Sequence, residues 1–248
     1  MKTPPLISTH DLAVGHGGKG LIERIELHLH GGELVALIGV NGGGKSTLLG
    51  PLAGQLPPVS GKVVLSGVDL GRYTAAERAK QLAIVYTGRP QVGLLDVRTI
   101  VALGRQPWTG YFGKLSPHDH RMVDEAMEQM AVTPFAQRTL QHLSDGEAQR
   151  VMIARALAQD TPVLLLDEPM AFLDLVNRVK LLRTLRELAR TRKRVIVLST
   201  HDLHTALELC DHALLINDKR LWSGTTEEAR SSGILQRMFD SDGALRVP

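Results

Sequence analysis

The chain contains several short runs in which nearly every residue is apolar, and a helical pattern follows each of them. Runs of this kind are typical of strands buried on both faces, as in a parallel sheet covered by helices. Their alternation with helices predicts an α/β core with a mainly parallel sheet. The expected strands are residues 34–38, 83–86, 163–166 and 195–199, and the expected helices are 45–53, 75–80, 175–190 and 202–209.

Other segments interrupt this alternation. Residues 25–30 alternate apolar and polar positions, which predicts a strand with one face in solvent. Between about residues 89 and 159 the pattern is mostly helical, so an inserted helical unit is expected there. Further strands are expected at 6–14, 63–66, 213–216 and 220–223, the last two as a hairpin.

The composition adds limits to this picture. Of 248 residues, 43% are hydrophobic and 22% charged, which is ordinary for a folded globular chain. The net charge is only +3 without a dense basic stripe, so no nucleic-acid partner is expected. No apolar run approaches the ~20 residues of a membrane span, and the first twelve residues lack the apolar segment of a signal peptide. The single cysteine, Cys210, is expected to pack rather than react.

Residues 39–46 read Gly-Val-Asn-Gly-Gly-Gly-Lys-Ser and match the phosphate-binding pattern G-x-x-x-x-G-K-[ST]. A loop that wraps a triphosphate with backbone N–H groups needs glycine where the backbone comes close, and the next helix directs its N-terminus at the phosphates. Lys45 is expected to neutralise the β and γ oxygens, and Ser46 to ligate Mg²⁺. The expected nucleotide-binding residues here are Gly39, Asn41, Gly42, Gly43, Gly44, Lys45, Ser46 and Thr47.

Two carboxylates follow the apolar strand expected at 163–166. Ligands sit at the carboxyl ends of such strands, so Asp167 and Glu168 are expected beside the phosphates. Asp167 can hold Mg²⁺ through water, and Glu168 can orient or deprotonate the attacking water.

A third motif, Leu-Ser-Asp-Gly-Glu at 143–147, precedes that strand by about one helix. With these motifs in this order, the chain resembles the nucleotide-binding subunits of ABC transporters over about residues 6–239. The signature motif resembles the family's Leu-Ser-Gly-Gly-Gln, with Asp145 and Glu147 as departures. The resemblance implies a P-loop NTPase (RecA-like) core with an antiparallel β subdomain, formed by about 1–88 and 160–248. The helical subdomain inserted at about 89–159 carries the signature motif.

The resemblance implies roles for further residues. Phe172-Leu173-Asp174 is similar to the loop that contacts a partner subunit, and His201 stands where the family has a histidine that senses the γ-phosphate. His16 lies where an adenine-stacking tyrosine is common. The family's Q-loop glutamine falls at Thr87, which is a possible Mg²⁺ contact; Gln91 is a substitute four residues on, and the sequence leaves the choice open.

The resemblance also implies partners. ATP is expected between the P-loop of one copy and Ser144 and Gly146 of a second, with two transmembrane permease subunits and a periplasmic or lipid-anchored substrate-binding protein. The expected place is the cytoplasmic face of a bacterial inner membrane.

The run Val-Ala-Leu-Gly-Arg at 101–105, with Pro107 after it, resembles importers of iron–siderophore, haem or cobalamin. Iron–siderophore is the expected cargo, with haem or cobalamin as alternatives. A soluble ABC ATPase of DNA repair or translation and a P-loop kinase are further alternatives. About a hundred residues separate Gly44 from the signature without sustained heptads, which argues against the coiled-coil repair proteins.

Overall fold

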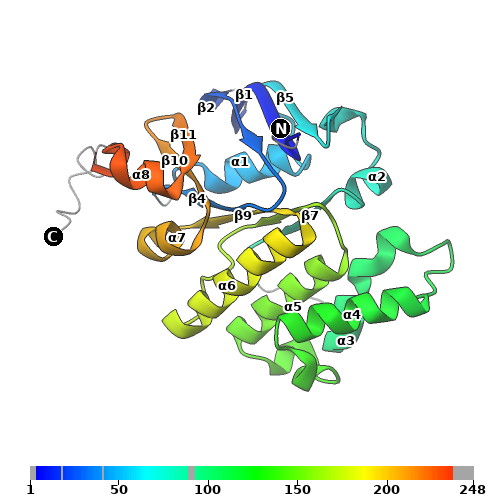
Figure 1. Cartoon of the computed structure of the whole chain (residues 1–248). Helices are drawn as coiled ribbons and strands as arrows, with labels where there is room; N and C mark the ends of the chain where they lie inside the picture. Colours follow the sequence, from blue (N-terminus) through cyan, green and yellow to red (C-terminus); the bar gives the residue numbers. More distant parts are fainter. Residues whose placement is uncertain (1–3, 18, 41, 89–92, 237–248) are drawn as a thin grey trace.

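A computed structural model describes residues 4–17, 19–40, 42–88 and 93–236 (Figure 1). Its larger sheet has six strands in the order β11-β10-β4-β9-β8-β7. All neighbours in it pair in parallel except β10 and β11, which form an antiparallel hairpin, so the mainly parallel core is confirmed. The strands are β4 (Leu34–Ile38), β7 (Leu82–Val85), β8 (Val163–Leu166), β9 (Val195–Thr200), β10 (His212–Asn217) and β11 (Arg220–Thr225).

The second sheet is antiparallel and lies at the top of Figure 1. Its order is β2-β1-β5-β6, and β3 pairs with β1. This is the antiparallel β part that the sequence predicts. The strands are β1 (Ile7–His16), β2 (Lys19–Ile25), β3 (His28–Leu29), β5 (Ser60–Leu65) and β6 (Val68–Asp69).

The prediction of one strand over residues 25–30 is wrong, and β2 was not predicted. The chain leaves β2 at Ile25 and forms only the short β3. Between them the buried Thr9 hydroxyl donates to Ile25 O at 2.7 Å and accepts from Leu27 N at 2.9 Å. A side chain therefore satisfies the backbone groups that a continuous ladder would pair, while the apolar alternation continues through the break.

The helices lie mostly on the opposite side of the larger sheet from the antiparallel strands (Figure 1). Among the described residues, no helix combines the length and apolar character needed to cross a membrane. The α-helices are α1 (Lys45–Leu52), α2 (Ala75–Ala79), α3 (Val97–Ala102), α4 (Pro117–Gln129), α5 (Asp145–Ala158), α6 (Leu175–Arg192), α7 (Leu203–Leu209) and α8 (Thr226–Ser231). The 3₁₀ helices are η1 (Leu70–Arg72), η2 (Leu103–Trp108), η3 (Thr133–Phe135) and η4 (Leu140–His142).

Both faces of the larger sheet are buried. In β4, Val35 and Leu37 pack with α1 and the antiparallel sheet, whereas Leu34, Ala36 and Ile38 pack with the helices of the other side. The same alternation holds in β8 and β9, which explains why these strands have continuous apolar sequences. The proposed division at about residues 88 and 160 stays a prediction, because the helices between them share one buried cluster with the sheet.

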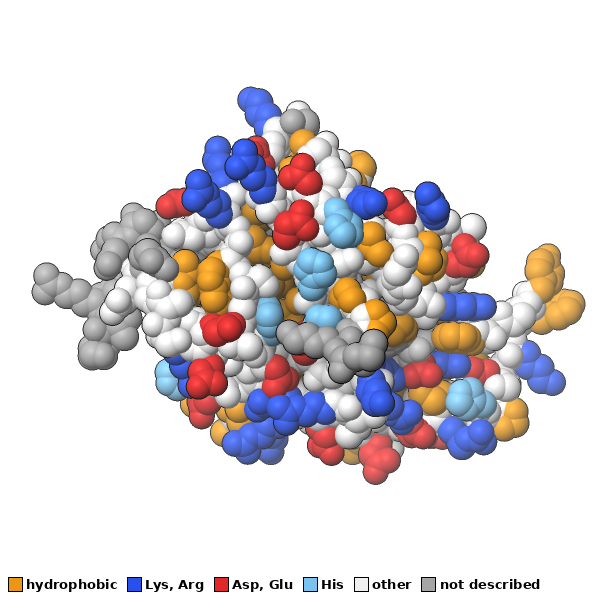
Figure 2. All heavy atoms as spheres, turned by 45° about the horizontal axis from the view of Figure 1, so that its top comes forward, with side chains coloured by type: hydrophobic (Ala, Val, Ile, Leu, Met, Phe, Trp, Pro, Cys, Tyr) orange, Lys and Arg blue, Asp and Glu red, His pale blue; other side chains and the backbone are white. Residues whose placement is uncertain are grey.

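The side chain of Cys210 is buried. Burial raises the pKa of the Cys210 thiol to about 12, which fits a packing residue. On the face seen in Figure 2, acidic and basic side chains are interspersed.

A buried arginine of η2, Arg105, bonds to the first turn of α4 and to the end of α5. Arg105 Nε donates to Asp119 Oδ1 at 2.8 Å and Arg105 Nη1 donates to Ala158 O at 2.8 Å, and both charged side chains are almost fully enclosed. Burial raises the pKa of Asp119, but hydrogen bonds from Ser116 and Arg105 outweigh it and hold the value at about 2. The stability that this carboxylate contributes is present above its ordinary value of 3.8 and is lost as the pH falls toward 2.

We expect Arg105→Met to lower the free energy of unfolding by about 3 kcal/mol, because it leaves the Asp119 carboxylate buried without its cation. Arg98→Met is the matched control. Arg98 of α3 pairs with Asp124 of α4 in solvent, so this substitution should change the free energy of unfolding by less than ~1 kcal/mol. Urea unfolding at neutral pH measures both. Equal losses of unfolding free energy in the two variants would show that burial of the Arg105–Asp119 pair does not set its contribution to stability.

Candidate active site

The glycine-rich loop connects β4 to α1, at the carboxyl edge of the larger sheet. Lys45 Nζ donates to Gly39 O at 2.9 Å and to Val40 O at 3.3 Å, so the lysine folds back over its own loop. It also lies 3.5 Å from Glu168 Oε1. The loop thus holds a nearly buried ammonium group beside a carboxylate, in the place where the sequence predicts phosphates.

The backbone of this loop requires glycine at two points. Gly42 and Gly44 have φ angles of 76° and 99°, which other residues adopt only with strain. Gly44 is the N-cap residue of α1 and has no side chain with which to cap it, and the positive end of the helix dipole faces the loop, where an anion is favoured. Ser46 and Thr47 lie in the first turn. Asn41 and the side chain of His16 lie outside the described residues, so their predicted contacts stay predictions.

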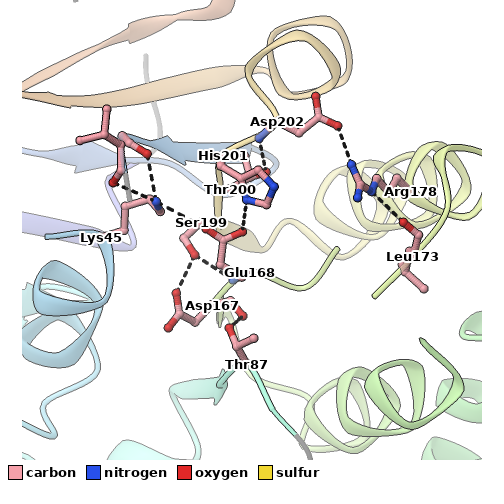
Figure 3. Close-up of polar contacts among 12 residues, drawn as sticks. Lys45, Thr87, Asp167, Glu168, Leu173, Arg178, Ser199, Thr200, His201 and Asp202 are labelled. Atoms are coloured by element: carbon pink, nitrogen blue, oxygen red, sulfur yellow. Dashed lines mark hydrogen bonds and ion pairs between the residues drawn. The ribbon is translucent and has the colours of Figure 1, made fainter. Parts of the chain in front are cut away.

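Asp167 follows β8 and is fixed by two hydroxyl groups. Ser199 Oγ donates to Asp167 Oδ1 at 2.6 Å (Figure 3). Ser46 Oγ donates to Asp167 Oδ2 at 2.9 Å. The structure therefore brings the predicted Mg²⁺ residues Ser46 and Asp167 together, although 121 positions separate them. Hard oxygen ligands on a single hydroxyl and a single carboxylate suit Mg²⁺, which takes its remaining ligands from phosphates and water.

Glu168 lies between two side chains that can carry positive charge. Its Oε1 is 3.5 Å from Lys45 Nζ, and its Oε2 is 3.1 Å from Nδ1 of His201. His201 follows β9, the strand between β4 and β8 in the sheet, so three neighbouring strand ends supply the three side chains. These predicted residues therefore converge, and Figure 3 shows them pointing toward one another.

Thr87 follows β7, and its predicted contact with Mg²⁺ stays a prediction. Its hydroxyl donates to the backbone carbonyl oxygen of Asp167 at 2.7 Å. It therefore contacts the main chain of the proposed metal-binding residue rather than its carboxylate. Gln91 lies outside the described residues.

The signature motif lines a separate groove of about 500 Å³, formed with residues 172–174 and part of α6. None of the described residues of the glycine-rich loop lines it, so Ser144 and Gly146 lie apart from the site described above within one copy of the chain. A Cβ at Gly146 would lie 3.0 Å from Phe172 O, which explains why the backbones approach only with glycine there.

Glu147 and Ser144 form a capping box at the N-terminus of α5. Ser144 N and Ser144 Oγ both donate to Glu147 Oε2, at 2.8 and 2.9 Å, and Ser144 Oγ accepts from Glu147 N. The hydrogen bonds from the backbone and side chain of Ser144 lower the pKa of Glu147. The departure at Glu147 thus has a structural consequence, because its carboxylate engages the signature serine.

Sequence reasoning gave no role to Ser199 or Arg178. Ser199 is fully buried, accepts from Glu168 N at 2.8 Å and donates to Asp167. Arg178 of α6 donates to Leu173 O at 2.8 Å and pairs with Asp202 beside His201. A hydroxyl at the end of the apolar strand β9 was the available signal for Ser199, whereas Arg178 resembles any helix-surface arginine.

Comparison with known proteins identifies this arrangement. The ABC transporter family matches residues 22–171. The hemin import ATP-binding protein HmuV of Streptomyces coelicolor is 38% identical, covering 95% of this chain and 83% of its own length. The achromobactin transport ATP-binding protein CbrD of Dickeya dadantii is 36% identical, covering 95% and 88%.

A solved structure supports the same assignment. The ATP-binding subunit of an ABC transporter superposes with a TM-score of 0.81 at 26% identity, covering 95% of this chain and 98% of the other. The chain therefore belongs to the ABC transporter family, as one of its ATP-hydrolysing subunits.

Proposed function

We propose that this chain drives an importer of a metal chelate, with an iron–siderophore complex as cargo. The observation that carries the catalytic part is the convergence of Lys45, Asp167 and Glu168 at one sheet edge. The similarity to subunits named for hemin import and achromobactin transport supports the cargo class. Haem and cobalamin are the alternative cargoes.

The contacts support a division of roles among the site residues. The loop N–H groups and Lys45 bind the β and γ phosphates, while Ser46 and Asp167 hold Mg²⁺, which neutralises developing charge when bound. Glu168 orients the attacking water and accepts its proton. His201, which lies beside the other carboxylate oxygen of Glu168 from Lys45, would contact the γ-phosphate. His16 is proposed to stack on adenine.

The second half of each site comes from a second copy of the chain. Ser144 and Gly146 line a groove away from the glycine-rich loop, so they serve the nucleotide of a partner. ATP favours the closed pair because it contacts both copies, and hydrolysis permits reopening. Two permease subunits at the cytoplasmic face of a bacterial inner membrane use this motion, and a substrate-binding protein delivers the cargo.

We expect Glu168→Gln to lower ATP turnover at least roughly 100-fold while ATP still binds, because the amide cannot accept the proton of the water. With Mg-ATP the variant should form a stable dimer, measured by size exclusion with light scattering. Glu208→Gln is the matched control, since Glu208 is exposed on α7, where it lies 3.9 Å from His204 Nδ1. Full turnover by Glu168→Gln would refute the assigned base.

Asp145 adds a negative charge to the groove that would face the partner's triphosphate. We expect Asp145→Asn in the Glu168→Gln background to tighten the ATP-bound dimer roughly fivefold, because it removes a repulsion of about 1 kcal/mol. The dimer dissociation constant measures this effect. Asp124→Asn, which removes an exposed acid on α4, should leave it unchanged. An unaltered dimer in Asp145→Asn would show that this carboxylate does not face the nucleotide.

The cargo is tested with the complete transporter. The chain is reconstituted with its permease and substrate-binding protein, and ATPase stimulation is measured with the binding protein loaded with each candidate cargo. We expect a ferric siderophore to stimulate turnover more than haem or cobalamin. Stimulation by haem or cobalamin alone would replace the proposed cargo without affecting the catalytic assignment.

A further inference from the structure

Two hydroxyl groups hold the Asp167-Glu168 pair from the strands on either side. Thr87, after β7, donates to Asp167 O at 2.7 Å. Ser199, in β9, donates to Asp167 Oδ1 at 2.6 Å and accepts from Glu168 N at 2.8 Å (Figure 3). We propose that Ser199 and Thr87 are positioning residues for ATP hydrolysis, which together form a hydroxyl clamp on the two carboxylate residues. The proposal rests on the roles assigned to Asp167 and Glu168 above.

The bonds of Ser199 leave little freedom to its hydroxyl. A serine hydroxyl has one proton to donate, and here the proton goes to Asp167. Its oxygen accepts from the Glu168 N–H group, and the side chain is fully buried, so water does not compete for either bond. The same atom therefore sets the carboxylate of Asp167 and the backbone of Glu168.

Glu168 needs this support because its backbone is strained. Its φ angle is 46°, in the left-handed region that residues with a Cβ rarely adopt. Such a conformation persists only when its surroundings fix it, and the bond from Glu168 N to Ser199 is one such restraint. Without it, the turn can relax and move the carboxylate from its position between Lys45 and His201.

The clamp also gives the two carboxylate oxygens of Asp167 different hydrogen-bond donors. Ser199 takes Oδ1, which leaves Oδ2 toward Ser46. Thr87 fixes the carbonyl of the same residue from the opposite strand, β7. Together these bonds allow the Asp167 carboxylate one orientation relative to Ser46. The clamp should therefore govern Mg²⁺ dependence and turnover, and it should not govern the binding of ATP to the glycine-rich loop.

Thr87 stands where the resembling family has a glutamine, and the clamp gives it a defined task. Its hydroxyl reaches the main chain of Asp167 directly, so its effect on the reaction passes through that residue. The clamp depends on the proton that this hydroxyl donates.

The test compares Ser199→Ala and Thr87→Val, which remove one hydroxyl each, with Thr87→Ser, which keeps it. We expect Ser199→Ala to lower kcat and to raise the Mg²⁺ concentration that gives the half-maximal rate. The product of the two changes should be roughly 10–100-fold, as for other residues that orient metal ligands. Thr87→Val should lower kcat roughly fivefold, the effect of one ordinary hydrogen bond, and Thr87→Ser should restore it. Binding of a fluorescent ATP analogue without Mg²⁺ should stay within about twofold of the unsubstituted chain, because the clamp does not touch the loop.

Thr161→Val is the matched control. Thr161 is buried and donates its hydroxyl to Val163 O at 2.7 Å, at the opposite end of β8. Its removal costs a similar hydrogen bond but should leave kcat and Mg²⁺ dependence unchanged at a temperature where all variants are folded. Thermal melting checks this condition, and the exposed Thr87 provides the decisive comparison where Ser199→Ala does not fold.

Loss of kcat in Thr87→Val with recovery in Thr87→Ser supports the clamp. Unchanged kcat and Mg²⁺ dependence in Thr87→Val and in folded Ser199→Ala overturns it. Glu168→Gln is measured alongside: an inactive Glu168→Gln with active clamp variants refutes the clamp alone, whereas an active Glu168→Gln refutes the catalytic assignment on which the clamp rests.

Discussion

The hydrogen bond from Ser46 Oγ to Asp167 Oδ2 connects the two halves of the active site. Ser46 lies in the first turn of α1, after the glycine-rich loop, and Asp167 follows β8, a strand two places from β4 in the same sheet. The bond can form because parallel strands bring their carboxyl ends to one edge. Strand order thus determines which motifs meet, and the strand between them, β9, contributes Ser199 and His201 to the gap.

Much of the core could be predicted because burial on both faces leaves a strong signal. The expected strands at 34–38 and 163–166 agree with β4 and β8 to the residue. Strand β2 gave no such signal, because it has polar residues at an exposed edge and its pairing depends on β1. The break between β2 and β3 depends on Thr9, sixteen residues from its partner Ile25, and no local pattern indicates that contact.

The residues of the active site could likewise be predicted only in part from the sequence. The glycine-rich loop and the acidic pair could be located from the sequence, because backbone wrapping and a strand-end carboxylate each require particular residue types. The contacts of Thr87 and Ser199 could not, since each bond joins segments that are 80 or 32 positions apart. A motif identifies the side chains that face the ligand, whereas the side chains that hold them are determined by how neighbouring strands align.

The signature motif shows how a local bond can oppose a distant one. Ser144 donates its hydroxyl proton to Glu147, in addition to the two bonds of the capping box of α5. A hydroxyl has only one proton, so Ser144 can donate to a partner's phosphate only by releasing Glu147. Glu147 keeps its bond to the Ser144 backbone N–H group, so the cap survives this exchange. The helix can therefore remain intact while its N-cap residue changes partner, and contact with a second copy does not require α5 to unwind.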